Sequence, residues 1–312
     1  MKEKKVIFVV GPTASGKTEL AVALAKRLYS EVVSADSMQI YKGMHIASAA
    51  PDEKEMNGVP HSMIEFLPYG ANFTVADYAD MARKEILRII SSGRTPVVAG
   101  GTGLYINALA NNVKFLPAKT DIKLRERLNA EYDAAGGEAM LNKLKETDPD
   151  AAQKLHISDK RRIVRALEIY ETSGITKTKQ NELSRLNPPE FKPVMIGITY
   201  SDRQKLYDRI NTRVDNMIKS GLLDEAHCAF HSGVTGGATQ AIGHKELFSY
   251  FAGEQSLGEA VESLKQATRR YAKRQLTWFN RDERINWIYR DLTPDVFSEA
   301  IRIIESEGIR NA

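Results

Sequence analysis

The sequence predicts an α/β protein in which a parallel β-sheet is flanked by helices and carries an inserted all-helical domain. Three observations support this prediction. Short apolar runs alternate with helical patterns through residues 1–110, residues 114–193 are charged and helical without a strand-like run, and an apolar run returns at Val194–Ile198. Apolar runs separated by helices are typical of parallel sheets that are covered on both faces.

The elements follow in order along the chain. Predicted strands lie at Val6–Val10, Glu31–Ser34, Thr95–Ala99, Val194–Ile198 and Ile285–Tyr289. Predicted helices lie at Thr18–Leu28, Ala76–Ile90, Ile122–Tyr132, Glu138–Glu146, Lys160–Thr172, Gln204–Lys219, Leu222–Ser232, Lys245–Phe251, Leu257–Phe279 and Pro294–Ser306. We assign residues 1–114 and 194–312 to a core domain and residues 115–193 to the helical insertion, which Asn187-Pro188-Pro189 closes.

The composition fits a globular enzyme of the cytoplasm. The 312 residues are 42% hydrophobic and 27% charged, with a net charge of +4, which permits a nucleic-acid partner without requiring one. The single cysteine, Cys228, excludes internal disulfides. No apolar run approaches the length that spans a bilayer, so we expect no membrane association. We also expect a monomer.

A phosphate-binding loop follows the first predicted strand. Gly11–Thr18 reads Gly-Pro-Thr-Ala-Ser-Gly-Lys-Thr and matches G-x-x-x-x-G-K-[ST] between a strand and a helix, as in P-loop NTPase-like folds. Its glycines allow backbone N–H groups to surround an anion, and the helix N-terminus adds partial positive charge. Lys17 would reach the outer phosphate, and the Thr18 hydroxyl would ordinarily bind Mg²⁺. The motif predicts a polyphosphate ligand but does not specify ATP.

One acidic residue stands out near this loop. Nucleotide hydrolases usually carry an Asp after a later strand, but here the third strand runs into Gly100-Gly101-Thr102. Asp36 follows the second strand instead, at the sheet edge where ligands bind. It could accept a proton from a nucleophile or only cap the next turn. Both a group transferase that holds diphosphate as leaving group and a small-molecule kinase fit this arrangement.

Three basic clusters lie on predicted helices. They comprise Lys160 with Arg161, Arg162 and Arg165; Arg209 with Arg213; and Arg269, Arg270, Lys273 and Arg274 with Tyr271 and Trp278. They could clamp phosphates, follow a nucleic-acid backbone or form solvated helix faces. His227 and His231 are spaced i, i+4, but no further ligand pattern supports a zinc site.

Longer strings resemble the tRNA dimethylallyltransferase family, also called tRNA isopentenyltransferases. The resemblance begins with the phosphate loop and Ser34-Ala35-Asp36-Ser37-Met38-Gln39-Ile40-Tyr41-Lys42-Gly43-Met44. It continues through Val59-Pro60-His61, Phe73-Thr74-Val75-Ala76-Asp77-Tyr78, Val98-Ala99-Gly100-Gly101-Thr102-Gly103-Leu104-Tyr105 and Arg161-Arg162-Ile163-Val164-Arg165-Ala166-Leu167-Glu168. Tyr207–Val214, Ala241–Glu246 and Lys273–Trp278 complete it, so that the strings span roughly residues 5–290 in the order of the family.

This resemblance implies an activity and a set of site residues. The family transfers a dimethylallyl group from dimethylallyl diphosphate to N6 of the adenosine immediately 3′ of the anticodon in tRNA, with Mg²⁺. The implied catalytic residues are Asp36, Lys17 and Arg213. The implied diphosphate site is Gly11, Pro12, Thr13, Ala14, Ser15, Gly16, Lys17 and Thr18, with Thr18 also on the metal. The residues implied to contact the tRNA anticodon stem-loop are Asp36, Ser37, Met38, Gln39, Thr102, Arg125, Arg161, Arg162, Ile163, Val164 and Arg165.

The chain departs from the family pattern, which usually has Asp-Ile-Gly-Thr-Ala-Lys-Pro where this chain reads His45-Ile46-Ala47-Ser48-Ala49-Ala50-Pro51. Ala50 replaces a usual lysine, Ser62 stands where a second histidine is common, and His244 stands where tyrosine is common. Rival predictions are an adenylate isopentenyltransferase, a nucleoside or small-acid kinase, and a non-catalytic RNA-binding module. The helical insertion favours the larger RNA acceptor over free AMP, and the third strand without an acid disfavours the kinase.

Overall fold

The computed structural model describes residues 3–115, 121–234 and 237–309, without the side chain of residue 240. The chain divides into two compact units. Unit 1 comprises Met1–Ala110 and Pro189–Ala312, and unit 2 comprises Asn111–Pro188. The predicted boundaries of the insertion lie within five residues of those of unit 2.

Unit 1 is built on a six-stranded sheet with the order β3-β2-β4-β1-β5-β6, in which every neighbouring pair is parallel. Its strands are β1 (Lys5–Val10), β2 (Val32–Ser34), β3 (His61–Ser62), β4 (Val97–Gly100), β5 (Lys192–Thr199) and β6 (Asn286–Tyr289). The strand predicted at Val194–Ile198 is therefore confirmed as β5, which pairs with β1 although the whole of unit 2 separates them in the chain. The two-residue strand β3 escaped prediction because it is too short to show a pattern.

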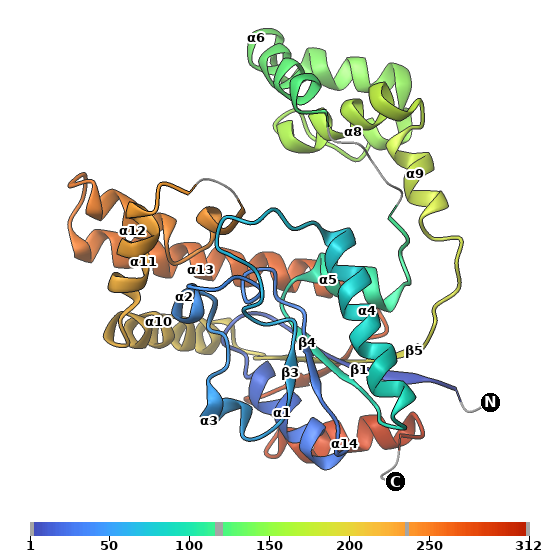
Figure 1. Cartoon of the computed structure of the whole chain (residues 1–312), viewed down its shortest axis with the longest axis vertical. Helices are drawn as coiled ribbons and strands as arrows, with labels where there is room; N and C mark the ends of the chain where they lie inside the picture. Colours follow the sequence, from blue (N-terminus) through green and yellow to red (C-terminus); the bar gives the residue numbers. More distant parts are fainter. Residues whose placement is uncertain (1–2, 116–120, 235–236, 310–312) are drawn as a thin grey trace. The chain divides into compact units, whose positions relative to one another are not determined.

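Helices cover both faces of this sheet (Figure 1). Side chains alternate along β1: Val6, Phe8 and Val10 enter one core with α4 (Val75–Ser91) and α5 (Gly103–Ala110). Ile7 and Val9 enter the other core with α1 (Lys17–Arg27) and α14 (Val296–Ser306). All five side chains are fully buried, as expected for a central parallel strand.

The other described helices of unit 1 lie within residues 45–56 and 203–279. They are α2 (His45–Ser48), α3 (Glu53–Met56), α10 (Arg203–Lys219), α11 (Leu222–His231), α12 (Lys245–Phe251) and α13 (Leu257–Phe279), with the 3₁₀ turn η1 (Gly237–Gln240). Val214, Leu222, Leu247 and Leu264 from four of these helices form a separate apolar cluster. This cluster fixes α10 and α13, both of which contribute side chains to the site described below.

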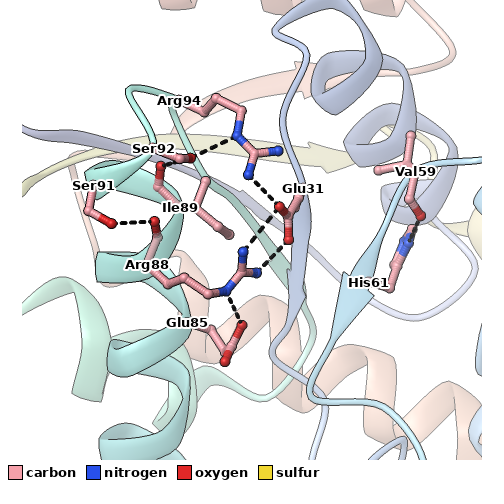
Figure 2. Close-up of polar contacts among 9 residues, drawn as sticks. All are labelled: Glu31, Val59, His61, Glu85, Arg88, Ile89, Ser91, Ser92 and Arg94. Carbon is pink, nitrogen blue, oxygen red and sulfur yellow. Dashed lines mark hydrogen bonds and ion pairs between the residues drawn. The ribbon is translucent and has the colours of Figure 1, made fainter.

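An ion-pair cluster anchors the start of β2 to the end of α4 (Figure 2). The Glu31 carboxylate accepts hydrogen bonds from Arg88 Nη2 at 2.5 Å and from Arg94 Nη2 at 2.6 Å. The Glu31 side chain is only 12% exposed, and the hydrogen bond from Arg88 lowers its pKa below the ordinary value. Arg94 Nε also donates to Ser92 Oγ, so that the turn after α4 is held as well.

Unit 2 is helical, as predicted. It contains α6 (Ile122–Thr147), α7 (Pro149–Ala152), α8 (Lys160–Ser173) and α9 (Lys177–Leu183), and apolar side chains of α6, α7 and α8 form a core of their own. The two helices predicted at Ile122–Tyr132 and Glu138–Glu146 are joined in α6, which is interrupted at Gly136 with φ 83° and ψ 164°. Asp148 links α7 to α9, because its carboxylate accepts hydrogen bonds from Ala151 N and from Thr178 N and Oγ1.

Within the described residues, no helix is both long and apolar enough to cross a membrane.

Candidate active site

The phosphate loop connects β1 to α1 and is held in a narrow space. Gly11 has φ 145°, and a Cβ there would lie 2.2 Å from the carbonyl oxygen of Ile198. Gly16 has φ 95° and precedes Lys17, the first residue of α1. Only glycine suits both backbone conformations without strain. The loop therefore presents the N-terminus of α1 at the carboxyl end of the sheet, where an anion is stabilised.

Lys17 lies at the centre of the site. Its Nζ donates a 2.7 Å hydrogen bond to the carbonyl oxygen of Pro12. Burial and the nearby Arg213 guanidinium lower the pKa of Lys17 to about 7, and the Asp36 carboxylate opposes this shift. The ammonium is therefore poorly compensated within the protein, and an added phosphate anion would favour its charged form.

Arg213 and Arg209 reach the phosphate loop from α10. Burial lowers the pKa of Arg213, while the carboxylate of Asp36 partly offsets this effect. Arg209 Nε donates to the carbonyl oxygen of Ala14 at 3.2 Å, and its guanidinium lies 5.8 Å from the centre of the Tyr200 ring. The predicted clamp residue Arg213 is thus brought beside Lys17 and Asp36, and Arg209 supports the loop itself.

Asp36 follows β2 on the other side of the site. Its Oδ1 accepts a hydrogen bond from Met38 N at 2.9 Å, which forms a tight turn two residues long. Thr102 Oγ1 accepts from Ser37 N at 2.9 Å, and Ser34 Oγ donates to Gln39 Oε1 at 2.8 Å. The turn-capping role considered from the sequence is therefore present, and it fixes the carboxylate at the edge of the cavity.

Lys17, Asp36 and Arg213 line one cavity of about 320 Å³, which also includes Thr13, Thr18, Met38, Tyr271 and Gln275. A second cavity of about 730 Å³ shares Lys17, Thr18 and Arg213 with the first and extends along α10. Lys17, Thr18 and Arg213 therefore lie where the two cavities meet. An anion bound by these three residues would be accessible from both cavities.

Thr18 is the predicted metal ligand, and it lines both cavities at this junction. In the described part of the chain, no group of three or more His, Cys, Asp or Glu side chains could enclose a metal ion. Mg²⁺ does not need such a group, because it takes one or two protein oxygens and completes its shell with phosphate oxygens and water. A single hydroxyl beside an anion site fits that ion.

The predicted RNA-contacting residues of unit 2 differ in accessibility. Arg161 and Arg162 are exposed at the start of α8. Arg125 and Arg165 are partly exposed, and both pair with the fully buried carboxylate of Glu168, at 3.0 and 2.8 Å.

The side chains of Ile163 and Val164 are buried in the core of unit 2. An apolar side chain in a packed core is not available to a ligand, so that the contact of these two residues with tRNA stays a prediction for their backbone atoms. Their positions on α8 instead direct the neighbouring arginines outward.

Sequence analysis did not identify Gln275. It lies on the buried face of α13 at 5% exposure, and its amide contacts both the phosphate loop and the turn after β4. The sequence showed it only within the family-like string Lys273–Trp278 and as a polar residue on the face that also carries Ala272 and Phe279. Such a residue is also common at the edge of an amphipathic face, so that the sequence did not single it out.

His244 was noted in the sequence only as a departure from the family pattern. It is fully buried, and its ring nitrogens lie 3.3 Å from Tyr69 Oη and 3.0 Å from Glu225 Oε1. Glu225 in turn accepts hydrogen bonds from the backbone N–H groups of Ile46 and Ala47. The histidine therefore supports the segment of α2 that lines the first cavity.

Comparisons with known proteins identify the family of this chain. The family model described as IPP transferase matches residues 39–282. A tRNA dimethylallyltransferase from Acetivibrio thermocellus is 48% identical over 288 residues, 92% of each chain. One from Halalkalibacterium halodurans is 43% identical and covers 98% of this chain and 96% of its own.

Two solved structures are also similar. The full-length tRNA isopentenylpyrophosphate transferase from Bacillus halodurans has a TM-score of 0.70 and 41% identity, covering 98% of this chain and 95% of its own. A eukaryotic dimethylallyltransferase acting on tRNA has a TM-score of 0.81 and 28% identity, covering 97% of this chain and 79% of its own. A P-loop fold with this cavity, a family model over most of the sequence and close relatives over nearly its full length lead to one conclusion: this chain belongs to the IPP transferase family, the family of the tRNA dimethylallyltransferases.

Proposed function

We propose that this protein transfers a dimethylallyl group from dimethylallyl diphosphate to N6 of the adenosine immediately 3′ of the anticodon in tRNA, releasing diphosphate. The observation that carries this proposal is the juxtaposition of a cationic anion site and a carboxylate. Lys17 and Arg213 line the same cavity as Asp36, and each interacts electrostatically with that carboxylate. The protein acts as a monomer in the cytoplasm, where its tRNA acceptor is found.

The cationic side of the cavity stabilises the leaving group. As the bond between the allylic carbon and the diphosphate oxygen breaks, negative charge grows on the diphosphate. Lys17, Arg213 and the N–H groups at the start of α1 are aimed at that charge, and one such contact typically contributes on the order of 3 kcal/mol. Mg²⁺, held by the Thr18 hydroxyl and the diphosphate oxygens, would supply further charge neutralisation when bound.

The carboxylate side activates the acceptor. The adenine N6 amine is a poor nucleophile because its lone pair is delocalised into the ring. Asp36 accepts a hydrogen bond from this amine and takes its proton as the new bond between N6 and the allylic carbon forms. The turn from Asp36 to Gln39 lines the cavity that receives the base. A base in an anticodon loop leaves its stack at a cost of only a few kcal/mol.

A transfer assay tests this proposal. Purified protein is incubated with labelled dimethylallyl diphosphate and an anticodon stem-loop, with AMP as the competing acceptor. Label on the stem-loop adenosine supports the proposal, label on AMP alone supports an adenylate isopentenyltransferase, and phosphoryl transfer from ATP without prenylation supports a kinase.

A further inference from the structure

Gln275 is a buried polar side chain that the proposed chemistry does not use. It projects from α13 between Ala272 and Phe279, which are also buried. Burying a carboxamide is unfavourable unless both its N–H and its C=O groups find partners. The partners that Gln275 finds therefore indicate what this side chain does.

Both partners belong to the active site, on two different loops. Gln275 Oε1 accepts a hydrogen bond from Thr13 N at 2.8 Å, within the phosphate loop. Gln275 Nε2 donates to the carbonyl oxygen of Gly101 at 3.0 Å, in the turn after β4. An N–H group can only donate and a carbonyl can only accept, so that these two partners fix the orientation of the amide. One side chain thus joins the loops that follow β1 and β4.

The turn after β4 has little room to move. A Cβ at Gly101 would lie 2.1 Å from Gln275 Nε2, and one at Gly103 would lie 2.2 Å from Trp278 Cδ1, so that α13 presses on one side of the turn. A Cβ at Gly100 would lie 2.2 Å from the carbonyl oxygen of Ala35. The turn is therefore held between α13 and the residue that immediately precedes Asp36.

The hydrogen bonds continue from this turn to the carboxylate side of the site. Thr102 N donates to the carbonyl oxygen of Ala35 at 3.2 Å, and Ser37 N donates to Thr102 Oγ1 at 2.9 Å. A continuous path of contacts thus runs from the phosphate loop through Gln275 and Thr102 to both neighbours of Asp36. Lys17 and Asp36 sit at the two ends of this path.

We propose that Gln275 is a positioning residue, which holds the phosphate loop and the Asp36 turn at a fixed separation so that the leaving group and the attacking amine are aligned. This inference rests on the proposed function and deepens it. Misplacing reacting groups by about 1 Å can lower a rate by about 100-fold while leaving each partner bound. The effect of Gln275 therefore belongs to turnover rather than to the affinity for either substrate.

Two variants and one control test the inference. Gln275→Met keeps the length of the side chain but removes both hydrogen bonds. Gln275→Glu keeps the acceptor, and it regains a donor only when its carboxyl group is protonated. Gln266→Met is the control, because Gln266 is exposed on the same helix. The measurements are kcat with the stem-loop, the Kd of inorganic diphosphate, the Kd of the stem-loop and the thermal midpoint.

For Gln275→Met we expect kcat to fall about 30- to 100-fold, with both Kd values within about three-fold of wild type. For Gln275→Glu we expect the ratio of its kcat to that of wild type to be at least several-fold higher at pH 6 than at pH 8. The reason is that the protonated carboxyl group donates to Gly101 and accepts from Thr13 as the amide does. The control retains wild-type values throughout.

Other outcomes overturn the inference. A folded Gln275→Met protein with wild-type kcat excludes a positioning role, and a loss confined to the Kd of diphosphate makes Gln275 part of the donor site alone. If Gln275→Met does not fold, a Gln275→Glu protein whose pH profile parallels that of wild type is equally decisive. A wild-type enzyme that does not prenylate the stem-loop refutes the proposed function instead, and that result is distinct from all of these.

Discussion

The ammonium of Lys17 donates its hydrogen bond to the carbonyl oxygen of Pro12, five residues earlier in the same phosphate loop. This hydrogen bond orients the ammonium without neutralising it. Burial and Arg213 leave its pKa at about 7, well below the ordinary lysine value of 10.5. The charge state of the proposed diphosphate site therefore changes within the physiological pH range.

Diphosphate binding is predicted to be coupled to proton uptake by Lys17. An anion beside the ammonium raises its pKa, so that binding above pH 7 draws a proton from solution, whereas below pH 7 the proton is already present. At pH 8, wild type should take up about 0.9 more protons than Lys17→Arg, and at pH 6 only about 0.1 more. Calorimetry of inorganic diphosphate binding in two buffers of different ionisation enthalpy measures this number. An equal proton count in the two proteins at pH 8 contradicts the prediction.

Replacing the Asp36 carboxylate should stop transfer without preventing binding. Asp36→Ala is expected to lower kcat at least 100-fold, because general-base catalysis contributes about 10²- to 10⁴-fold. The affinity for the stem-loop should remain within a few-fold of wild type, since one side chain is a small part of an RNA interface. Single-turnover prenylation and stem-loop binding, measured on the same preparation, test both parts. Substantial residual turnover would remove Asp36 from the role of base.

The exposed arginines at the start of α8 should contribute the salt-dependent part of tRNA affinity. Replacing Arg161 and Arg162 by Ala should lower the slope of log K against log salt concentration by about 0.7 to 0.9 for each phosphate that these side chains neutralise. Lys145→Ala with Lys154→Ala is the control, because it removes the same charge from exposed positions of unit 2. If the two double variants have the same slope, Arg161 and Arg162 make no specific interaction with RNA.

The Glu31 cluster should stabilise unit 1 in a pH-dependent manner. Glu31→Gln removes the charge that Arg88 and Arg94 share, and we expect a loss of about 1 to 2 kcal/mol, because hydrogen bonds to charged groups contribute about that much and Arg88 is half exposed. The pKa of Glu31 is lowered in the folded state, so that its contribution is present above the ordinary value of 4.5 and is lost as the pH falls further. Urea unfolding of both proteins at pH 7 and pH 3.5 should show the difference in stability shrink at the lower pH.

Local patterns account for most of what could be predicted from the sequence. The phosphate loop, β1 and α1 follow one another directly, so that their spacing alone placed Lys17 at a helix start. The approach of Arg213 to Lys17 and Asp36 followed from the family resemblance, since the residues lie far apart in the chain. Gln275 could not be recognised, because its partners are backbone groups of residues more than 170 positions away. The burial of Ile163 and Val164 depends on which face of α8 packs against α6, and a cluster of neighbouring arginines obscures that face.

The pairing of β1 with both β4 and β5 has a consequence for biosynthesis. β4 ends at Gly100, whereas β5 begins only at Lys192, after the entire helical unit. On the ribosome, β1 can pair only with β4 during the time needed to translate unit 2. Unit 2 itself is contiguous in the chain and can form its own core in that time. Until the later strand emerges, one edge of β1 offers unpaired backbone groups to any other nascent chain. Prompt completion of the sheet thus protects the newly made enzyme from aggregation.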